Sequence, residues 1–264
     1  MTRRRADVVL AERGLFPSRE QARAAILAGE VRIAGRPLLK AGELIDEDER
    51  VEIASRPRFV SRGGEKLAWA LEVFDLSVAG LSAIDVGAST GGFTDCLLQA
   101  GAATVVALDV GYGQLAWSLR TDDRVAVIER TNVRTVDPVE IGAPFDIVVC
   151  DVSFISLRTI LPTLASLMGH ESQMLVLVKP QFEVGKGRVG KRGVVREPTA
   201  HVEVLERVTM AVRDERLVVR GLTWSPIKGP EGNIEFWIHA AFAGRPTCSD
   251  LSDVVNAAHA ALGG

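Results

Sequence analysis

Apolar residues recur with two different spacings along the chain, and the change of spacing separates a short N-terminal part from a longer remainder. In the first part, apolar positions at every third or fourth residue predict helices over residues 4–14 and 19–28. Ser18 is placed to cap the second helix and Gly29 to end it. Short β segments follow at residues 31–35, 36–42 and 47–54. The pattern predicts a small α+β unit.

From residue 64 onward, segments with helical spacing alternate with short and nearly continuous apolar runs. Such runs are typical of strands in a parallel sheet that helices cover on both faces. The predicted strands are residues 82–86, 104–110, 125–134, 145–154 and 173–182, followed by an antiparallel hairpin of residues 217–227 and 234–242. The second part is therefore predicted to be an α/β fold with a mostly parallel, seven-stranded sheet.

Length and composition narrow the class of protein. The chain has 264 residues, of which 47% are hydrophobic, and this is enough for a packed core. Its three cysteines, Cys96, Cys150 and Cys248, are scattered without metal-ligand spacing, so we expect no metal and a reducing, cytoplasmic location. We expect no membrane association, because the apolar runs are too short to span a bilayer and no secretion signal is present.

Positive charge gathers near the N-terminus, although the net charge of the chain is −3. Nine lysines and arginines lie in the first forty residues, against four acids. Arginines on such a surface bind phosphates and give affinity for RNA without reading its sequence. A solvated charged face is the alternative. The candidate RNA-binding residues here are Arg3, Arg4, Arg5, Arg19, Arg23, Arg32 and Arg36.

The stretch SAIDVGASTGG, residues 82–92, predicts a strand, a glycine-rich loop and the start of a helix. This geometry lets a nucleotide-like ligand approach the backbone closely. The spacing differs from that of dinucleotide and P-loop motifs and indicates a site for S-adenosylmethionine (SAM). Asp109 would accept hydrogen bonds from the ribose hydroxyls of SAM. An ordinary tight turn is the alternative. The candidate cofactor-binding residues are Asp85, Gly87, Ser89, Thr90, Gly91, Gly92, Phe93, Asp109 and Asn132.

Lys179 follows an apolar strand, MLVLV, where a charged group is partly desolvated. Desolvation favours the neutral amine, which is a base, and Asp151 at the end of the neighbouring strand would orient it. This arrangement suits the removal of a proton from a ribose hydroxyl. A lysine that extends from a strand end into solvent is the alternative.

Several motifs resemble known families. The pattern S-R-x-x-A-x-x-x-I-x-x-G-x-V-R-I-x-G is similar to the S4 RNA-binding domain over roughly residues 3–54. Together with this start, S-R-G-x-x-K-L, D-V-G-A-S-T-G-G-F-T-D, C-D-V-S-F-I-S, V-K-P-Q-F-E and G-x-x-G-N-I-E-F resemble the TlyA family of ribosomal-RNA 2′-O-methyltransferases, which are sometimes labelled hemolysins. We therefore expect an S4-like domain at residues 1–55, a linker at 56–63, and a Rossmann-like class I SAM-dependent methyltransferase domain of the FtsJ type at 64–264.

The resemblance also implies an activity. The lysine-aspartate-lysine-glutamate tetrad of FtsJ-type enzymes falls on Lys66, Asp151, Lys179 and Glu235, with Lys179 as the base. The implied substrate is cytidine in 16S or 23S ribosomal RNA, the implied methyl donor is SAM, and the implied partners are ribosomal subunits.

A glycine-rich, basic segment at residues 185–196 follows Lys179 and contains no acid. We interpret it as an RNA-contacting flap that uses Lys186, Arg188, Lys191 and Arg192. A solvated loop is the alternative.

Three other functions compete with the methyltransferase hypothesis. A membrane-active cytolysin has little support in the sequence, since no spanning segment or long amphipathic surface helix is predicted. An RNA-binding module without catalytic activity is disfavoured by the complete loop and tetrad. A pseudouridine synthase with an S4 domain is disfavoured by the SAM-type loop.

Overall fold

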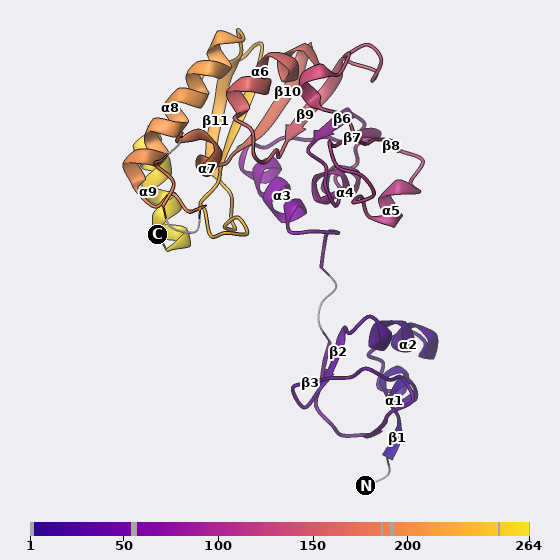
Figure 1. Ribbon diagram of the computed structural model, residues 1–264. Helices are drawn as coiled ribbons and strands as arrows, with labels where there is room; N and C mark the ends of the chain where they lie inside the picture. The colour runs from indigo at the N-terminus through magenta and orange to yellow at the C-terminus, as the bar shows by residue number, and fades with distance from the viewer. Residues whose placement is uncertain (1–2, 54–56, 186, 191–192, 248, 264) are drawn as a thin grey trace. The chain divides into compact units, whose positions relative to one another are not determined.

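The chain folds as two compact units, Met1–Pro57 and Arg58–Gly264 (Figure 1). The structure, a computed structural model, describes residues 3–53, 57–185, 187–190, 193–247 and 249–263. The predicted domain boundary at residue 55 lies outside the described residues. Residues 58–62, predicted as linker, pack in the second unit, since Phe59 is buried in its core and Val60 N–H donates to the Asp95 carboxylate at 2.8 Å.

Within its described residues, the first unit has two helices and two small antiparallel sheets. The helices are α1 (Ala6–Glu12) and α2 (Arg19–Leu27). In one sheet, β1 (Arg3–Arg5) pairs with β4 (Leu44–Asp46), and in the other, β2 (Val31–Ile33) lies between β3 (Arg36–Pro37) and β5 (Val51–Ile53). Ser18 caps α2 as predicted, because its hydroxyl accepts the Gln21 N–H at 3.2 Å. The predicted helical start at residue 4 is wrong, since Arg3–Arg5 form a strand through pairing with residues distant in sequence.

The second unit is built on a seven-stranded sheet in the order β11-β12-β10-β9-β6-β7-β8. Its strands are β6 (Ser82–Val86), β7 (Thr104–Leu108), β8 (Val125–Ile128), β9 (Phe145–Cys150), β10 (Met168–Val178), β11 (Val218–Trp224) and β12 (Phe236–Ala241). The first five run parallel, and β12 runs antiparallel to both β10 and β11. The predicted mostly parallel sheet and its final hairpin are confirmed.

Helices cover both faces of this sheet (Figure 1). One face carries α3 (Gly63–Val73), α4 (Gly92–Gln99) and α5 (Trp117–Arg120), and the other carries α6 (Leu157–Ser166), α8 (Pro198–Asp214) and α9 (Leu251–Leu262). Two shorter elements are η1 (Val133–Thr135) and α7 (Pro180–Glu183). The sequence pattern did not predict α9. Among the described residues, no helix has the length and apolar character needed to cross a bilayer.

The chain order places a switch point between β6 and β9. From β6 the chain continues to β7 and β8 on one side and then returns to β9 on the other. In sheets of this kind, ligands bind beyond the carboxyl ends of the strands at that point. The candidate residues that follow β6, β7, β9 and β10 therefore meet at one edge.

Asp7 carries a buried charge that fixes the start of α1 in the first unit. It is 1% exposed, and its carboxylate accepts hydrogen bonds from Arg5 Nε at 3.0 Å and Arg19 Nε at 2.8 Å. The Arg5 guanidinium and then the Arg19 guanidinium lower the Asp7 pKa to about 2, against the opposing effect of burial.

This carboxylate predicts a pH dependence of stability for the first unit. A pKa lowered in the folded state stabilises the fold above pH ~4, and this stabilisation is lost as the pH falls toward 2. Because both arginines are about half exposed, we expect only about 1–2 kcal/mol. Amide hydrogen exchange of residues 6–27 at pH 6 and pH 3, corrected for intrinsic rates, measures the effect. Asp7→Asn should be less stable than the wild type at pH 6 and should lose less stability than the wild type between pH 6 and pH 3. An equal loss of stability in both proteins would contradict the role assigned to the Asp7 carboxylate.

Candidate active site

The glycine-rich loop at residues 87–92 joins β6 to α4 and lies directly against the loop that follows β9. Gly87 has a φ of +89°, and a Cβ there would lie 2.6 Å from the carbonyl oxygen of Asp151. Only glycine combines this backbone conformation with this close approach. At Gly92, a Cβ would lie 2.2 Å from Ser61 Oγ and 2.9 Å from Gly64 N. The loop is therefore confined between the Asp151 loop and the start of α3.

Two adjacent cavities open at this edge of the sheet, with volumes of about 430 and 500 Å³. They share four lining residues, Gly87, Ser89, Asp151 and Ser153. The first is lined among others by Asp109, Gln114 and Asn132. The second is lined among others by Arg62, Lys66, Phe93 and Lys179. Volumes of this size are typical of small-molecule sites, and the shared wall lets groups in one cavity reach the other.

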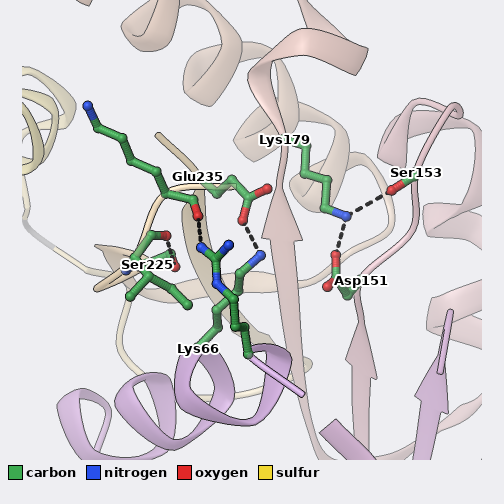
Figure 2. Close-up of polar contacts among 9 residues, drawn as sticks. Lys66, Asp151, Ser153, Lys179, Ser225 and Glu235 are labelled. Carbon is green, nitrogen blue, oxygen red and sulfur yellow. Dashed lines mark hydrogen bonds and ion pairs between the residues drawn. The ribbon is translucent and has the colours of Figure 1, made fainter. Parts of the chain in front are cut away.

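The predicted tetrad gathers beside the second cavity as two separate ion pairs (Figure 2). Lys66 Nζ lies 2.6 Å from Glu235 Oε2, and both side chains are almost fully buried. Lys179 Nζ lies 2.5 Å from Asp151 Oδ1 and donates to Ser153 Oγ at 3.0 Å. Lys66 comes from α3, whereas the other three come from the ends of β9 and β10 and the start of β12. The structure thus brings together all four residues that the sequence assigned to catalysis.

Burial sets the electrostatics of Glu235. Desolvation raises the Glu235 pKa, and the charge of Lys66 opposes that rise. Glu235 Oε1 is buried and has no hydrogen-bond partner among the described residues, and a Cβ on Gly229 would lie 2.5 Å from this oxygen. Because one carboxylate oxygen is unpaired, the Lys66–Glu235 contact carries most of the compensation for burying this charge.

Asp109 is positioned at the first cavity by backbone contacts. Its Oδ2 accepts the Ser89 N–H at 2.7 Å, and its Oδ1 accepts the Gly111 N–H at 2.6 Å. A carboxylate has about four acceptor sites, so two remain for hydroxyl groups of a ligand. Asp109 therefore both anchors the glycine loop and offers acceptors to the cavity.

Asn132 lines the same cavity but serves partly as a helix cap. Its Oδ1 accepts the Arg134 N–H at 3.0 Å at the start of η1. This bond identifies the oxygen, which leaves the amide NH₂ as the group available to a ligand.

Asp85 lies within β6, is fully buried and lines neither cavity. Its Oδ2 accepts the Thr94 N–H at 2.9 Å and the Thr94 hydroxyl at 2.7 Å, and burial raises its pKa to about 7. The contacts of Asp85 that the structure shows therefore fix the first turn of α4.

The remaining loop residues divide between the cavities. Thr90, Gly92 and Phe93 line the second cavity, whereas Gly91 lines neither. Gly91 has a φ of +94°, and a Cβ there would lie 2.3 Å from Leu119. The requirement for glycine at this position is structural.

Ser153 and Phe154 are among the cavity-lining residues that the sequence reasoning did not single out. Ser153 lines both cavities and contacts Lys179. Phe154 lines the first cavity, is 92% exposed and has a φ of +66°. Its ring contacts the Phe182 ring in a tilted arrangement, with ring centroids 5.2 Å apart. An exposed aromatic ring at the rim of a cavity is suited to stack on a nucleobase. Both lie in the motif C-D-V-S-F-I-S, but no spacing rule distinguishes them there.

Most arginines predicted to bind RNA in the first unit already pair with its acids. Arg4 contacts Glu12 at 2.7 Å and Glu47 at 3.0 Å. The other paired arginines are Arg3 with Asp46, Arg5 and Arg19 with Asp7, and Arg36 with Glu43. Within the described part of the chain, Arg23 and Arg32 are exposed and form no ion pair. These two carry the least compensated positive charge of the predicted set.

The basic segment after α7 is described only in part. Lys186, Lys191 and Arg192 lie outside the described residues. Arg188 is exposed and contacts Glu203 of α8 at 2.5 Å. Asn233 binds the end of the segment, since its Oδ1 accepts the Val195 N–H and its Nδ2 donates to the Gly193 carbonyl, both at 2.9 Å.

Comparison with known proteins gives matches to both units. Residues 59–242 match the FtsJ-like methyltransferase family, and residues 4–51 match the S4 domain. The 16S/23S rRNA (cytidine-2′-O)-methyltransferase TlyA of Mycobacterium tuberculosis is 46% identical, over 97% of this chain and 97% of its own length. Hemolysin A of Brachyspira hyodysenteriae is 38% identical, over 89% of this chain and 98% of its own length. A solved structure from Streptococcus thermophilus has a TM-score of 0.76 at 45% identity, covering 99% of this chain and 97% of that one.

The position of Asp109 predicts its effect on ligand binding. Asp109→Ala should raise the dissociation constant for SAM by about 10–100-fold, because it removes a charged acceptor and releases the Ser89 N–H. Isothermal titration calorimetry measures the constant. Asp122→Ala is the control, since Asp122 accepts the Arg124 N–H without lining either cavity. Unchanged affinity in Asp109→Ala would remove Asp109 from the binding site.

Proposed function

Because the chain belongs to the FtsJ-like methyltransferases, and among them to the TlyA family, we propose that it methylates the ribose 2′-hydroxyl of cytidine in ribosomal RNA, with SAM as the methyl donor. The resemblance predicted from the sequence motifs is thereby confirmed. The observation that carries the proposal is the position of Lys179, which lines the second cavity and whose amine contacts Asp151 and Ser153, two residues of the wall that the cavities share.

The residues of the first cavity fit SAM. Gly87 lines this cavity without a side chain, so a ligand can lie against its backbone, and Asp109 retains acceptors for two ribose hydroxyls. The NH₂ of Asn132 is available to a ring nitrogen of adenine. When bound, SAM supplies an electrophilic methyl group carried by its sulfonium.

The second cavity would receive the target nucleotide. In this proposal, Lys179 first releases its own proton to solvent; its amine then accepts the proton of the 2′-hydroxyl as that oxygen attacks the methyl group, and Asp151 stabilises the resulting ammonium. Ser153 keeps Nζ directed toward the shared wall. The short contact with Glu235 holds Lys66, which lines the same cavity. Much of the rate would come from holding the hydroxyl in place, since orientation alone can supply several orders of magnitude.

The first unit would hold the RNA. Its match to the S4 domain and the exposed charges of Arg23 and Arg32 support contacts with phosphates of ribosomal RNA. A ribosomal substrate would place the enzyme with ribosomes in the cytoplasm.

Replacing the proposed base tests the catalytic role. Lys179→Ala should lower kcat by about 10²–10⁴-fold and change the SAM dissociation constant less than about threefold, because general base catalysis contributes that range. The measurement is tritiated methyl transfer from SAM to ribosomal subunits from cells that lack the gene, with the methylated nucleotide mapped by mass spectrometry.

Arg213→Ala is the matched control, since it removes an exposed cation from the last turn of α8. Near-normal transfer by Lys179→Ala would overturn the assignment of the base. A wild-type protein that binds ribosomal RNA without transferring methyl groups would instead be a binding module.

The two unpaired arginines give a separate test of RNA binding. The double variant Arg23→Ala/Arg32→Ala should raise KM for ribosomal subunits about tenfold. The slope of log affinity against log salt concentration should become less steep, by the amount expected for the loss of about one to two phosphate contacts. SAM affinity should not change. Arg50→Ala is the control in the same unit, because Arg50 already pairs with Glu52 at 3.3 Å. An unchanged salt slope in the double variant would show that these arginines do not contact phosphate.

A further inference from the structure

Two loops carry the groups that hold the proposed base, and they touch each other at two places. Residues 151–156 follow β9, and residues 179–183 follow β10, which pairs with β9 in parallel. At one place Lys179 contacts Asp151 and Ser153. At the other, Glu183 contacts the end of the first loop. The second contact has no part in the chemistry proposed above.

Glu183 uses both of its carboxylate oxygens on the start of α6. Oε1 accepts the Leu157 N–H at 2.6 Å, and Oε2 accepts the Ser156 hydroxyl at 2.7 Å. The Arg158 Nε lies 3.6 Å from Oε2. Glu183 is only 4% exposed, so its charge is stabilised by these donors and by the positive end of the α6 dipole.

This carboxylate replaces the local cap that α6 lacks. Ser156 stands at the N-cap position, but its side chain caps no backbone N–H of the helix. Its hydroxyl donates to Glu183 instead. The first turn of a helix has N–H groups without partners, and a carboxylate from another element satisfies one of them here. As a result, the end of the Asp151 loop is attached to α7 and not to its own helix.

The segment between Lys179 and Glu183 is short and internally bonded. Pro180 is buried at the first position of α7, Phe182 N–H donates to the Lys179 carbonyl, and Val184 N–H donates to the Pro180 carbonyl, each at 3.0 Å. One turn of helix therefore fixes Glu183 relative to Lys179. A contact that holds Glu183 against Ser156 also sets the distance from Lys179 to Asp151 and Ser153.

We propose that Glu183 is a positioning residue, which holds the Asp151–Ser156 loop against α7 so that the Lys179 amine stays aligned on Asp151 and Ser153, beside the wall that the cavities share. The inference rests on the proposed methyltransferase function. It gives a role to Glu183, the last residue of the motif V-K-P-Q-F-E. Glu183 is not a member of the tetrad. The alternative role for Glu183 is a helix cap that serves stability alone.

The experiment compares substitutions by kcat for methyl transfer and by SAM affinity. Glu183→Ala should lower kcat about 10–100-fold, because misplacement by about 1 Å can cost that much. Its SAM dissociation constant should change by a smaller factor than kcat, because Asp109 and the glycine loop that it anchors through Ser89 are held independently of Glu183, although the Asp151–Ser156 loop also lines the first cavity. Glu183→Gln should stay within about threefold of wild type in kcat, since its amide oxygen accepts from Leu157 and its NH₂ donates to Ser156.

Two further variants separate positioning from stability. Asp146→Ala is the matched control, because Asp146 also accepts one backbone N–H and one hydroxyl, from Ser82 at 2.8 and 2.7 Å, at the opposite end of the strands. It should leave kcat unchanged. Ser156→Ala removes one of the two hydrogen bonds that Glu183 accepts and should lower kcat about 3–10-fold. This variant tests the proposal if Glu183→Ala does not fold. Hydrogen exchange of residues 151–157 should accelerate in Glu183→Ala and not in Glu183→Gln.

The outcomes are distinct. Normal kcat in Glu183→Ala or in Ser156→Ala overturns the positioning role. An equal loss in Glu183→Gln and Glu183→Ala, or in Asp146→Ala and Glu183→Ala, overturns it as well. A wild-type protein without methyl transfer overturns the proposed function and this inference with it, whereas an active wild type beside an active Glu183→Ala overturns this inference alone.

Discussion

The site depends on the close packing of Gly87 against the main chain of Asp151. The two loops leave adjacent parallel strands, β6 and β9, and a Cβ at residue 87 would lie 2.6 Å from the Asp151 carbonyl oxygen. Because the backbones touch, one wall serves both cavities, and a group bound in the first lies next to the Lys179 amine of the second. A larger residue at position 87 would push the two loops apart and so increase the distance between the two cavities.

The four tetrad charges show how such a wall tolerates ionised groups. Two lysines and two carboxylates form two short pairs, one buried and one partly buried, so each charge has a partner of opposite sign. Breaking one pair would leave an uncompensated buried charge, which costs more than the pair itself contributes. The raised pKa of Glu235 reflects the remaining desolvation that Lys66 does not offset. The Lys66–Glu235 pair is thus a fixed part of the cavity, while Lys179 faces the wall where chemistry is proposed.

The sequence predicted the sheet from local patterns, whereas the tetrad, which includes Lys66 on α3, followed from the resemblance to a known family. Apolar runs identify parallel strands, and parallel strands end at one edge. It could not predict contacts between distant segments. Arg3–Arg5 form a strand only because β4 pairs with them, and Asp7 engages two of the arginines assigned to RNA. The segment read as a linker contains Phe59, which is apolar and becomes buried against residues that follow it. The roles of Ser153, Phe154 and Glu183 depend on neighbours that no spacing rule supplies.

An acidic residue near a strand end can either bind a ligand or hold a loop in place, as Asp85, Asp109 and Glu183 show. Each accepts a backbone N–H from a loop or helix start at this edge, from Thr94, Ser89 and Leu157 respectively. Asp85 uses one oxygen on Thr94 and is sealed from the cavities, whereas Asp109 anchors the loop and still faces the ligand space. Glu183 acts from a neighbouring element. Since loops beyond parallel strands leave N–H groups without ladder partners, carboxylates at these ends are needed to hold the loops whether or not they bind ligand. An acid at a strand end therefore identifies the functional edge of the sheet, and only its exposure decides whether it serves the ligand or the loop.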